Sequence, residues 1–151
     1  MQHVLDPMAI SPPLLRLEDI SLTFGATPLI EHASFSVHAG DRIALIGRNG
    51  SGKSTLLKIA AGIVEASAGE VTSDRSATVR YLDQSPDMSG CETVGDYISQ
   101  GLGPMDNPHR VSYLAHELGL DETRAPHGLS GGEARRAALA RVLAPQPDIL
   151  L

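Results

Sequence analysis

A glycine-rich segment at residues 47–55, GRNGSGKST, constrains the fold more than any other feature of this sequence. It matches the pattern GxxxxGK followed by Ser or Thr, which arises by chance in roughly 1 of 30,000 windows. The aliphatic residues 42–46 (RIALI) precede it, and residues 53–62 (KSTLLKIAAG) have the apolar spacing of a helix. The sequence therefore predicts a strand, a phosphate-binding loop and a helix, in that order.

The residue types in this loop suit the phosphates of a nucleotide. Glycines allow successive backbone N–H groups to point at phosphate oxygens, and a helix that begins at Lys53 adds its positive N-terminal dipole. Lys53 is expected to reach the β- and γ-phosphates, and the Ser54 hydroxyl to ligate Mg²⁺. The predicted nucleotide-binding residues are Gly47, Arg48, Asn49, Gly50, Ser51, Gly52, Lys53, Ser54 and Thr55.

A second motif, LSGGE at residues 129–133, reads as a Ser-Gly-Gly turn that opens a helix. Ser130 and the amides of Gly131 and Gly132 would then form another anion-binding helix N-terminus. Two such sites in one chain raise a geometric problem. If both sites bound the same nucleotide, the loop at Lys53 would already bind its phosphates, and the second site would have no phosphate left to bind.

Strand-like patterns flank the phosphate loop. Short apolar runs bounded by Gly and Pro predict strands at residues 14–24 (LLRLEDISLTF), 33–37 (ASFSV) and 77–82 (ATVRYL). The last residues, 147–151 (PDILL), read as the opening of a buried strand, so we expect the boundary at the end to be a truncation. Residues 1–13, closed by a double proline, read as a loose leader.

Helical patterns prevail in the second half. Gly and Pro are frequent between Ser85 and Gly128, and we expect a small helical subdomain over about residues 85–128. Its helices are predicted around residues 93–100 (TVGDYISQ) and where Val111, Leu114, Ala115 and Leu118 share one helical face. Residues 131–144 (GGEARRAALARVLA) suit a longer helix, stopped by Pro145.

The composition is that of a globular domain, with 42% hydrophobic and 20% charged residues. A formal net charge of −6 argues against strong nucleic-acid binding by this segment. The single cysteine, Cys91, cannot form an internal disulfide, and no secretory signal pattern is visible. No apolar run approaches the roughly 18 residues of a membrane span. We therefore expect a cytoplasmic protein without direct membrane insertion.

The order of the motifs resembles that of ATP-binding cassette (ABC) ATPases. These motifs are the phosphate loop, a strand ending in Gln84 (YLDQ), LSGGE and the start of a PDILL strand. The resemblance covers residues 14–151. It implies an α/β fold: a P-loop NTPase ABC cassette with an antiparallel β subdomain, an incomplete RecA-like core and a small helical subdomain. It also implies ATP and Mg²⁺ as cofactors.

In that family two cassettes pair head to tail, and each ATP lies between the phosphate loop of one cassette and the LSGG helix of the other. The resemblance thus implies that the second motif serves the ATP of a partner cassette, which resolves the geometric problem. The partner would be a second cassette of the same longer chain or of a dimer. The residues concerned are Leu129, Ser130, Gly131, Gly132 and Glu133.

Two further residues take roles from the resemblance. Phe24 matches the aromatic residue that stacks on adenine, although an aromatic side chain at a strand end is more often part of a core. Gln84 matches the residue that contacts Mg²⁺ and the attacking water, although it could be a polar strand end. Lys53 and Gln84 are thus the candidate catalytic residues, and Ser54 and Gln84 the candidate metal ligands.

The signature continues as LSGGEARRAALARVL, whereas transporter cassettes commonly read LSGGQ followed by a Gln-Arg pair. This continuation is more similar to the soluble ABC-F class, and to its Uup-like members, which are associated with ribosomes and translation. Gln84 and Leu129 lie too close in sequence to leave much room for the arm that some ABC-F proteins carry. An ATP-binding subunit of a membrane transporter is the alternative.

A third interpretation is a segment that binds ATP without hydrolysing it. Family members continue the PDILL strand to an Asp that holds Mg²⁺ and a Glu that activates water. Without these carboxylates phosphoryl transfer lacks two positioning groups, so we expect negligible hydrolysis by residues 1–151. In this family, the strand that pairs with the phosphate-loop strand (residues 42–46 here) comes from a part of the sequence beyond residue 151. We therefore expect residues 1–151 to leave an open slot in the central sheet, with apolar surface exposed.

Overall fold

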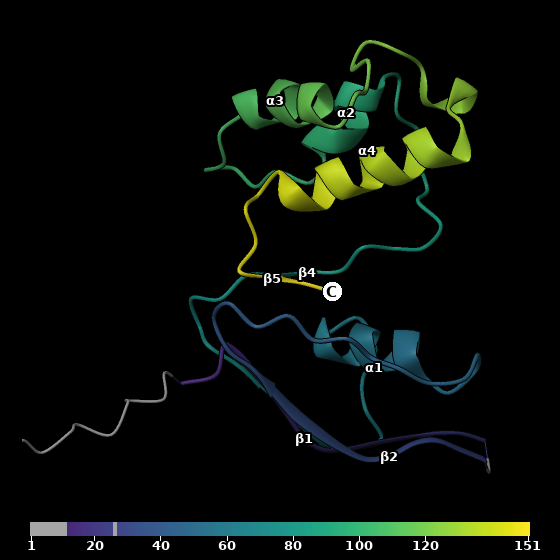
Figure 1. The fold of residues 1–151 in the computed structure, drawn as a ribbon, viewed down its shortest axis with the longest axis vertical. Coiled ribbons are helices and arrows are strands. Elements are labelled where there is room, and N and C mark those ends of the chain that lie inside the picture. The colour runs from purple at the N-terminus through teal and green to yellow at the C-terminus, as the bar shows by residue number, and fades with distance from the viewer. Residues whose placement is uncertain (1–11, 26) are drawn as a thin grey trace, which may run out of the picture. The chain divides into compact units, whose positions relative to one another are not determined.

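The computed structural model describes residues 12–25 and 27–151, and it describes Phe24 by its backbone alone. The chain divides into two compact units, Met1–Ala77 and Thr78–Leu151, and each is described by itself. Figure 1 shows the elements of each unit. The predicted leader at residues 1–13 falls outside the described residues except for Pro12 and Pro13.

The first unit is built on an antiparallel sheet of three strands in the order β2-β1-β3. The strands are β1 (Leu15–Phe24), β2 (Thr27–Val37) and β3 (Ala68–Ser73). The predicted strand at residues 14–24 is confirmed, and the one at 33–37 is the second half of the longer β2. β3 was missed, because all of its residues are exposed and it therefore lacks apolar alternation.

An irregularity in β1 keeps its apolar residues on one face. Leu15, Leu17, Ile20 and Leu22 are all buried, although a strict alternation would place the last two on the opposite face. The register between β1 and β2 shifts between Leu17 and Ile20, where Asp19 has a φ of 54°. This β-bulge turns the side chains of the second half of β1 to the same face as those of the first half, so that apolar residues are buried along the whole strand.

The helix predicted after the phosphate loop is confirmed as α1 (Lys53–Ala60). Ile59 and Ala60 bury its inner face, and Gly62 follows the helix with a φ of 71°, the left-handed conformation that commonly terminates helices. The predicted strand at residues 42–46 is wrong: the structure assigns no strand there.

The physical reason lies in pairing, because a strand needs a hydrogen-bonded neighbour. No such neighbour pairs with residues 42–46 within the part of the chain that the structure describes. Ile43 and Ile46 are accordingly 51% and 95% exposed.

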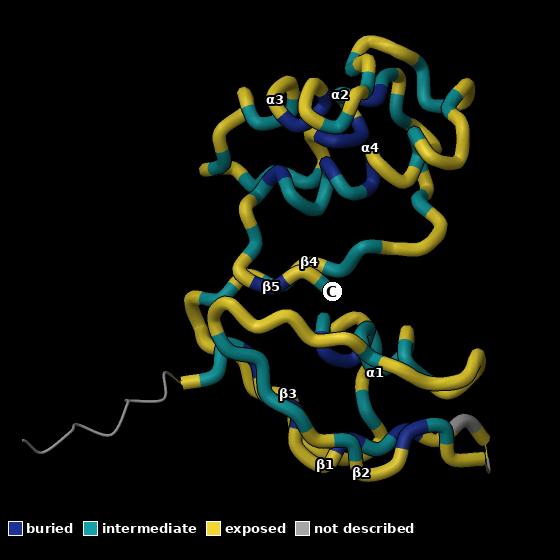
Figure 2. The backbone as a smooth tube through the Cα atoms, viewed as in Figure 1, coloured by how far each residue is buried: buried dark blue, intermediate teal, exposed yellow. Residues whose placement is uncertain are grey.

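The second unit contains three helices around one core, shown in dark blue in Figure 2. They are α2 (Val94–Ser99), α3 (His109–Glu117) and α4 (Gly131–Leu143), and all three were predicted. A short 3₁₀ turn, Pro126–Gly128, precedes α4. The buried core residues are Val94, Tyr97, Ile98, Leu114, Ala115, Ala137, Ala138, Ala140 and Ala144.

The same unit holds two short parallel strands, β4 (Val79–Arg80) and β5 (Ile149–Leu150). Strands were predicted at both places, and both are shorter than expected. Because parallel strands need a crossover connection, the three helices supply the chain that joins β4 to β5. None of the helices in the described ranges has the length and apolar character needed to cross a membrane.

Candidate functional site

The phosphate loop has the backbone shape that its glycines predict. Gly50 and Gly52 have φ values of 81° and 82°, which favour glycine. A Cβ on Gly52 would also lie 3.1 Å from Ile30 Cγ1 and 3.2 Å from the carbonyl oxygen of Leu29. The loop therefore requires glycine at position 52 both for its dihedral angles and for the space beside β2.

Lys53 closes the loop from the helix side. Its Nζ donates hydrogen bonds to the carbonyl oxygens of Gly47 and Arg48, each at 2.8 Å. The ammonium group is thereby held over the loop, where a phosphate chain would add a stronger, charge-assisted partner. Gly47 is exposed, and a Cβ there would lie 2.8 Å from Ser51 Oγ, so the Ser51 side chain would have to turn aside.

The N-terminus of α1 is open to an anion. Gly52 precedes the helix without any side-chain cap, and the first turn contains no acidic residue. The first N–H groups of a helix have no partner within it and carry the positive end of its dipole. Together with the glycine cradle and the Lys53 ammonium, this donor set fits the phosphates of ATP, and it draws all its groups from residues 47–55.

The remaining predicted loop residues lie at the surface. Arg48, Asn49, Gly50 and Ser51 are exposed, as is Ser54 in the first turn of α1, whereas Thr55 is half-buried. Phe24 is the last residue of β1, and its role in stacking on adenine stays a prediction. The assignment of Ser54 to Mg²⁺ likewise stays a prediction.

Gln84 is exposed and lies beyond the end of its strand. The prediction that the strand ends at Gln84 is wrong, because β4 ends at Arg80 and the last bond along it runs from Leu82 N to Leu151 O. Asp83 then begins a turn, in which its Oδ1 accepts a hydrogen bond from Ser85 N at 3.2 Å. Gln84 instead lines a shallow surface pocket with Leu82, Asp83 and Arg135.

The second motif forms the N-terminus of α4 as predicted from its sequence. Ser130 is the N-cap residue, and its Oγ accepts a hydrogen bond from Glu133 N at 3.3 Å. In return, Glu133 Oε2 accepts hydrogen bonds from Ser130 N and Ser130 Oγ, each at 2.7 Å. This capping box leaves the exposed Gly131 and Gly132 as the first two residues of the helix, with amides that have no helical partner. Leu129 packs half-buried against the core of the second unit.

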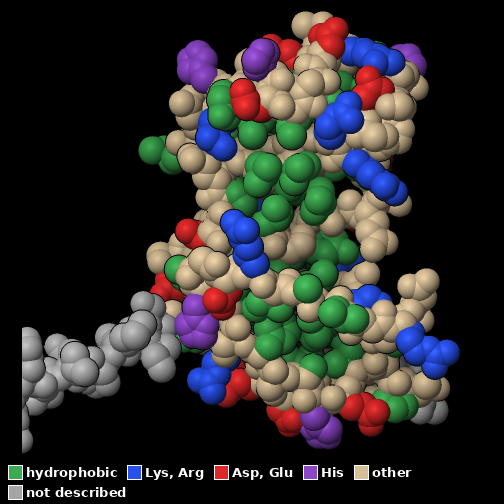
Figure 3. Space-filling model, viewed as in Figure 1, with side chains coloured by type: hydrophobic (Ala, Val, Ile, Leu, Met, Phe, Trp, Pro, Cys, Tyr) green, Lys and Arg blue, Asp and Glu red, His purple; other side chains and the backbone are tan. Residues whose placement is uncertain are grey.

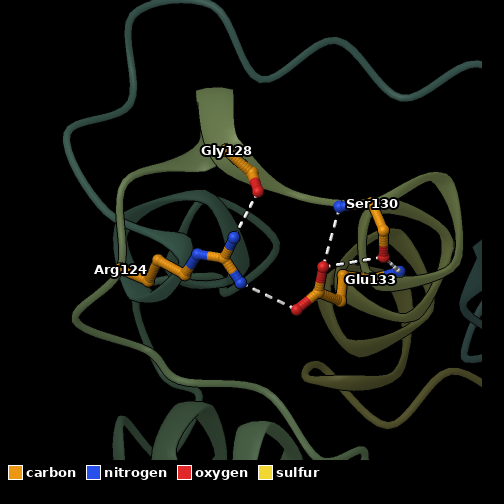
Figure 4. A network of polar contacts seen from close by, with 4 residues as sticks. All are labelled: Arg124, Gly128, Ser130 and Glu133. Atoms are coloured by element: carbon orange, nitrogen blue, oxygen red, sulfur yellow. Dashed lines mark hydrogen bonds and ion pairs between the residues drawn. The ribbon is translucent and has the colours of Figure 1, made fainter.

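Arg124 joins this capping box from the loop before it, as Figure 4 shows. Its Nη1 lies 2.8 Å from Glu133 Oε1, and its Nη2 donates to the carbonyl oxygen of Gly128. The hydrogen bonds from Ser130, with a contribution from the Arg124 charge, lower the pKa of Glu133 below its usual value. The sequence alone did not identify Arg124 as a partner of Glu133, because this contact depends on the path of the turn between the two residues.

Charge is mixed on the surface. On the face shown in Figure 3, Lys and Arg side chains are interspersed with acidic ones. In the described ranges, no group of three or more His, Cys, Asp or Glu residues could hold a metal ion. Ser54 and Gln84 stay the predicted ligands of Mg²⁺.

Comparison with known proteins places this geometry in a family. Residues 30–151 match the family model described as ABC transporter. The chain is 46% identical over 140 residues to the ATP-binding protein Uup of Caulobacter vibrioides, covering 92% of this chain and 22% of that protein. It is 35% identical over 142 residues to the zinc import ATP-binding protein ZnuC 1 of Hahella chejuensis, covering 93% of this chain and 55% of that protein.

The fold has close counterparts among solved structures. An inward-facing conformation of a putative metal-chelate type ABC transporter superposes with a TM-score of 0.76 at 22% identity, over 92% of this chain and 59% of that one. Together with the family match, this likeness confirms the predicted fold class, a P-loop NTPase cassette with an antiparallel sheet. The chain spans about a fifth of the length of its Uup relative and just over half that of the zinc import protein. From its phosphate loop to its final strand, the chain belongs to the ABC transporter family of ATP-binding cassettes.

Proposed function

We propose that this chain binds MgATP as a cassette of a soluble, ABC-F type ATPase, and that its own signature motif serves the ATP of a partner cassette. One observation carries the proposal: the described glycine cradle, the Lys53 ammonium and the open α1 N-terminus form one donor set, within a chain 46% identical to Uup. ATP hydrolysis, a family activity, is proposed for the longer protein.

The site residues divide by role. The backbone of residues 47–52 and the Lys53 ammonium hold the β- and γ-phosphates, and Thr55 lies beside them in the first turn of α1. Ser54 ligates Mg²⁺, Gln84 contacts Mg²⁺ and the attacking water, and Phe24 stacks on adenine. Leu129 to Glu133 face the partner's ATP, with Gly131 and Gly132 supplying the amides.

Nucleotide binding is tested with a fluorescent N-methylanthraniloyl ATP analogue and residues 1–151. Lys53→Ala should weaken its affinity by roughly tenfold or more, because a charge-assisted phosphate contact is lost. Lys58→Ala, which removes the same charge from the last turn of α1, is the matched control and should bind like the unaltered chain. Equal affinity of all three proteins would refute the proposed site.

The ABC-F assignment rests on the signature and on the Uup relatives, two of which are 46% and 30% identical to this chain. A transporter subunit is the second candidate, supported by the 35% identity to the zinc import protein. Cell fractionation separates them. An epitope-tagged form of the cellular protein that carries this sequence should sediment with ribosomes when ATP is supplied, whereas enrichment with the membranes would favour the transporter.

A phosphate-release assay distinguishes ATP binding without hydrolysis from ATP hydrolysis. It is carried out on residues 1–151 once they have been shown to bind the ATP analogue. Release no faster than from Lys53→Ala supports a segment that holds ATP but does not cleave it. Faster release assigns hydrolysis to residues 1–151 themselves, and the expectation of negligible turnover would then be wrong.

A further inference from the structure

We propose that Arg124 is a positioning residue of the signature motif, whose guanidinium neutralises and orients Glu133 so that the N-terminus of α4 can accept a phosphate. The inference rests on the proposed function, in which Gly131 and Gly132 serve the partner's ATP. It adds a residue outside the motif, and it explains how a motif that carries a carboxylate can bind an anion.

The glutamate creates an electrostatic conflict at this helix terminus. Its carboxylate accepts hydrogen bonds from Ser130 N and Ser130 Oγ at 2.7 Å, so its charge lies directly at the backbone that opens α4. A carboxylate there stabilises the helix dipole, but the same charge repels an incoming phosphate. A glutamine would form the same capping box without this repulsion.

Arg124 supplies the compensating charge. Its Nη1 contacts Glu133 Oε1 at 2.8 Å, on the carboxylate oxygen that Ser130 does not use. The two oxygens of Glu133 are thus divided: one binds the helix backbone and the other the guanidinium. The side chains of Arg124 and Glu133 are 44% and 26% exposed, so water screens the pair only in part, and the effect on anion binding should be moderate.

The backbone of the second unit fixes Arg124 in this place. The Arg124 carbonyl oxygen accepts a hydrogen bond from Val94 N, at the start of α2, at 2.9 Å. The guanidinium also donates to the carbonyl oxygen of Gly128, which lies just before the motif. Arg124 therefore links three segments: the α2 N-terminus through its carbonyl oxygen, and the turn at Gly128 and the α4 capping box through its guanidinium. Figure 4 shows the two guanidinium contacts.

The test is a titration of the ¹⁵N-labelled chain with inorganic phosphate, followed by the amide signals of Gly131 and Gly132. Arg124→Ala should weaken the phosphate affinity at these amides by up to about fivefold, the upper end of the effect of an exposed charge near a helix terminus. Glu133→Gln added to Arg124→Ala should restore the affinity to within about twofold, because the repelling charge is then gone as well.

Rescue distinguishes charge compensation from a structural role. If Arg124 only braced the turn, the double variant would bind phosphate as weakly as Arg124→Ala, and that result would overturn the inference, as would an unchanged affinity in Arg124→Ala. Should Arg124→Ala fail to fold, Glu133→Gln alone decides: tighter binding supports the inference, and equal or weaker binding contradicts it. Arg135→Ala, an exposed arginine of α4, is the matched charge control and should leave the affinity unchanged.

The same spectra report separately on the proposed function. MgATP should shift the amide signals of Gly50 and Gly52 in the phosphate loop. If those signals stay in place while phosphate still binds at Gly131 and Gly132 in the manner described, the proposed nucleotide site fails and the role of Arg124 stands.

Discussion

Thr78 and Asp148 exchange hydrogen bonds across 70 residues of sequence at the point where β4 and β5 begin. Asp148 Oδ2 accepts from both Thr78 N at 2.7 Å and Thr78 Oγ1 at 2.9 Å, and Asp148 N donates to the Thr78 carbonyl oxygen at 3.0 Å. Each strand pairs over only two residues, so this exchange fixes the parallel register by local bonds rather than by ladder length.

Asp148→Ala should therefore destabilise the second unit. The substitution leaves two Thr78 donors without this acceptor, and a lost hydrogen bond to a charged group costs about 1.5–3 kcal/mol, discounted here because both residues are exposed. We expect a loss of about 1 kcal/mol in the free energy of unfolding, measured by urea denaturation. Asp121→Ala, which removes a carboxylate that accepts hydrogen bonds from Thr123 within its own turn, is the control and should cost less. Equal losses would show that the exchange does not stabilise the unit.

Gly101 tests the packing of α2 against α4. A Cβ at Gly101 would lie 2.0 Å from the carbonyl oxygen of Arg141, which is part of the α4 backbone and cannot move aside alone. Gly101→Ala should thus separate the helices and cost about 2 kcal/mol or more of unfolding free energy, as overpacking commonly does. Gly103→Ala is the matched control, because its Cβ would meet only the Asp106 side chain at 3.4 Å. A thermal melt of Gly101→Ala that matched this control would contradict the prediction.

The helices were predictable from sequence because each carries its own signal. Thr93 and Asp96 stand three residues apart and form a capping box at α2, and Ser130 and Glu133 do the same at α4. The phosphate loop was predictable for a similar reason, since its glycines dictate a backbone shape that depends little on distant residues. Local chemistry was therefore sufficient for these parts.

The parts that were missed or predicted wrongly depend on partners elsewhere in the chain. Residues 42–46 are as apolar as a buried strand, yet they form none, because strand formation needs a paired neighbour and not only apolar side chains. β3 shows the converse: its residues are exposed and lack apolar alternation, yet pairing with β1 holds them in a sheet. The contact between Arg124 and Glu133 likewise required the path of a turn that no sequence pattern specifies.

Gly52→Ala tests whether the phosphate loop needs its left-handed glycine. Alanine at a φ of 82° is strained by roughly 1–2 kcal/mol, and its Cβ would press on the Leu29 carbonyl oxygen at 3.2 Å. The start of α1 should shift, and the affinity for the ATP analogue should fall by roughly tenfold or more, which corresponds to that strain energy. Gly62→Ala is the control, because it carries a similar strain at the end of α1 without any contact within 4 Å. It should lower stability while leaving nucleotide affinity unchanged, and an equal loss of affinity in both variants would refute a local role for Gly52.

The pair formed by Asp19 and His32 predicts a pH dependence of the first unit. His32 Nδ1 lies 2.6 Å from Asp19 Oδ1, and this hydrogen bond, reinforced by the Asp19 charge, raises the pKa of His32 above its ordinary value. Because folding favours the protonated imidazole, the stabilisation is fully present below the unfolded pKa of about 6.5 and is lost as the pH rises through the higher folded value. Both side chains are largely exposed, so the change should be small and should weaken in high salt. The urea midpoint should be measured between about pH 5 and 9, a range that includes the ordinary histidine pKa of about 6.5. It should decline across this range in the unaltered chain and not in Asp19→Asn. A decline of the same size in that variant would show that another group is responsible.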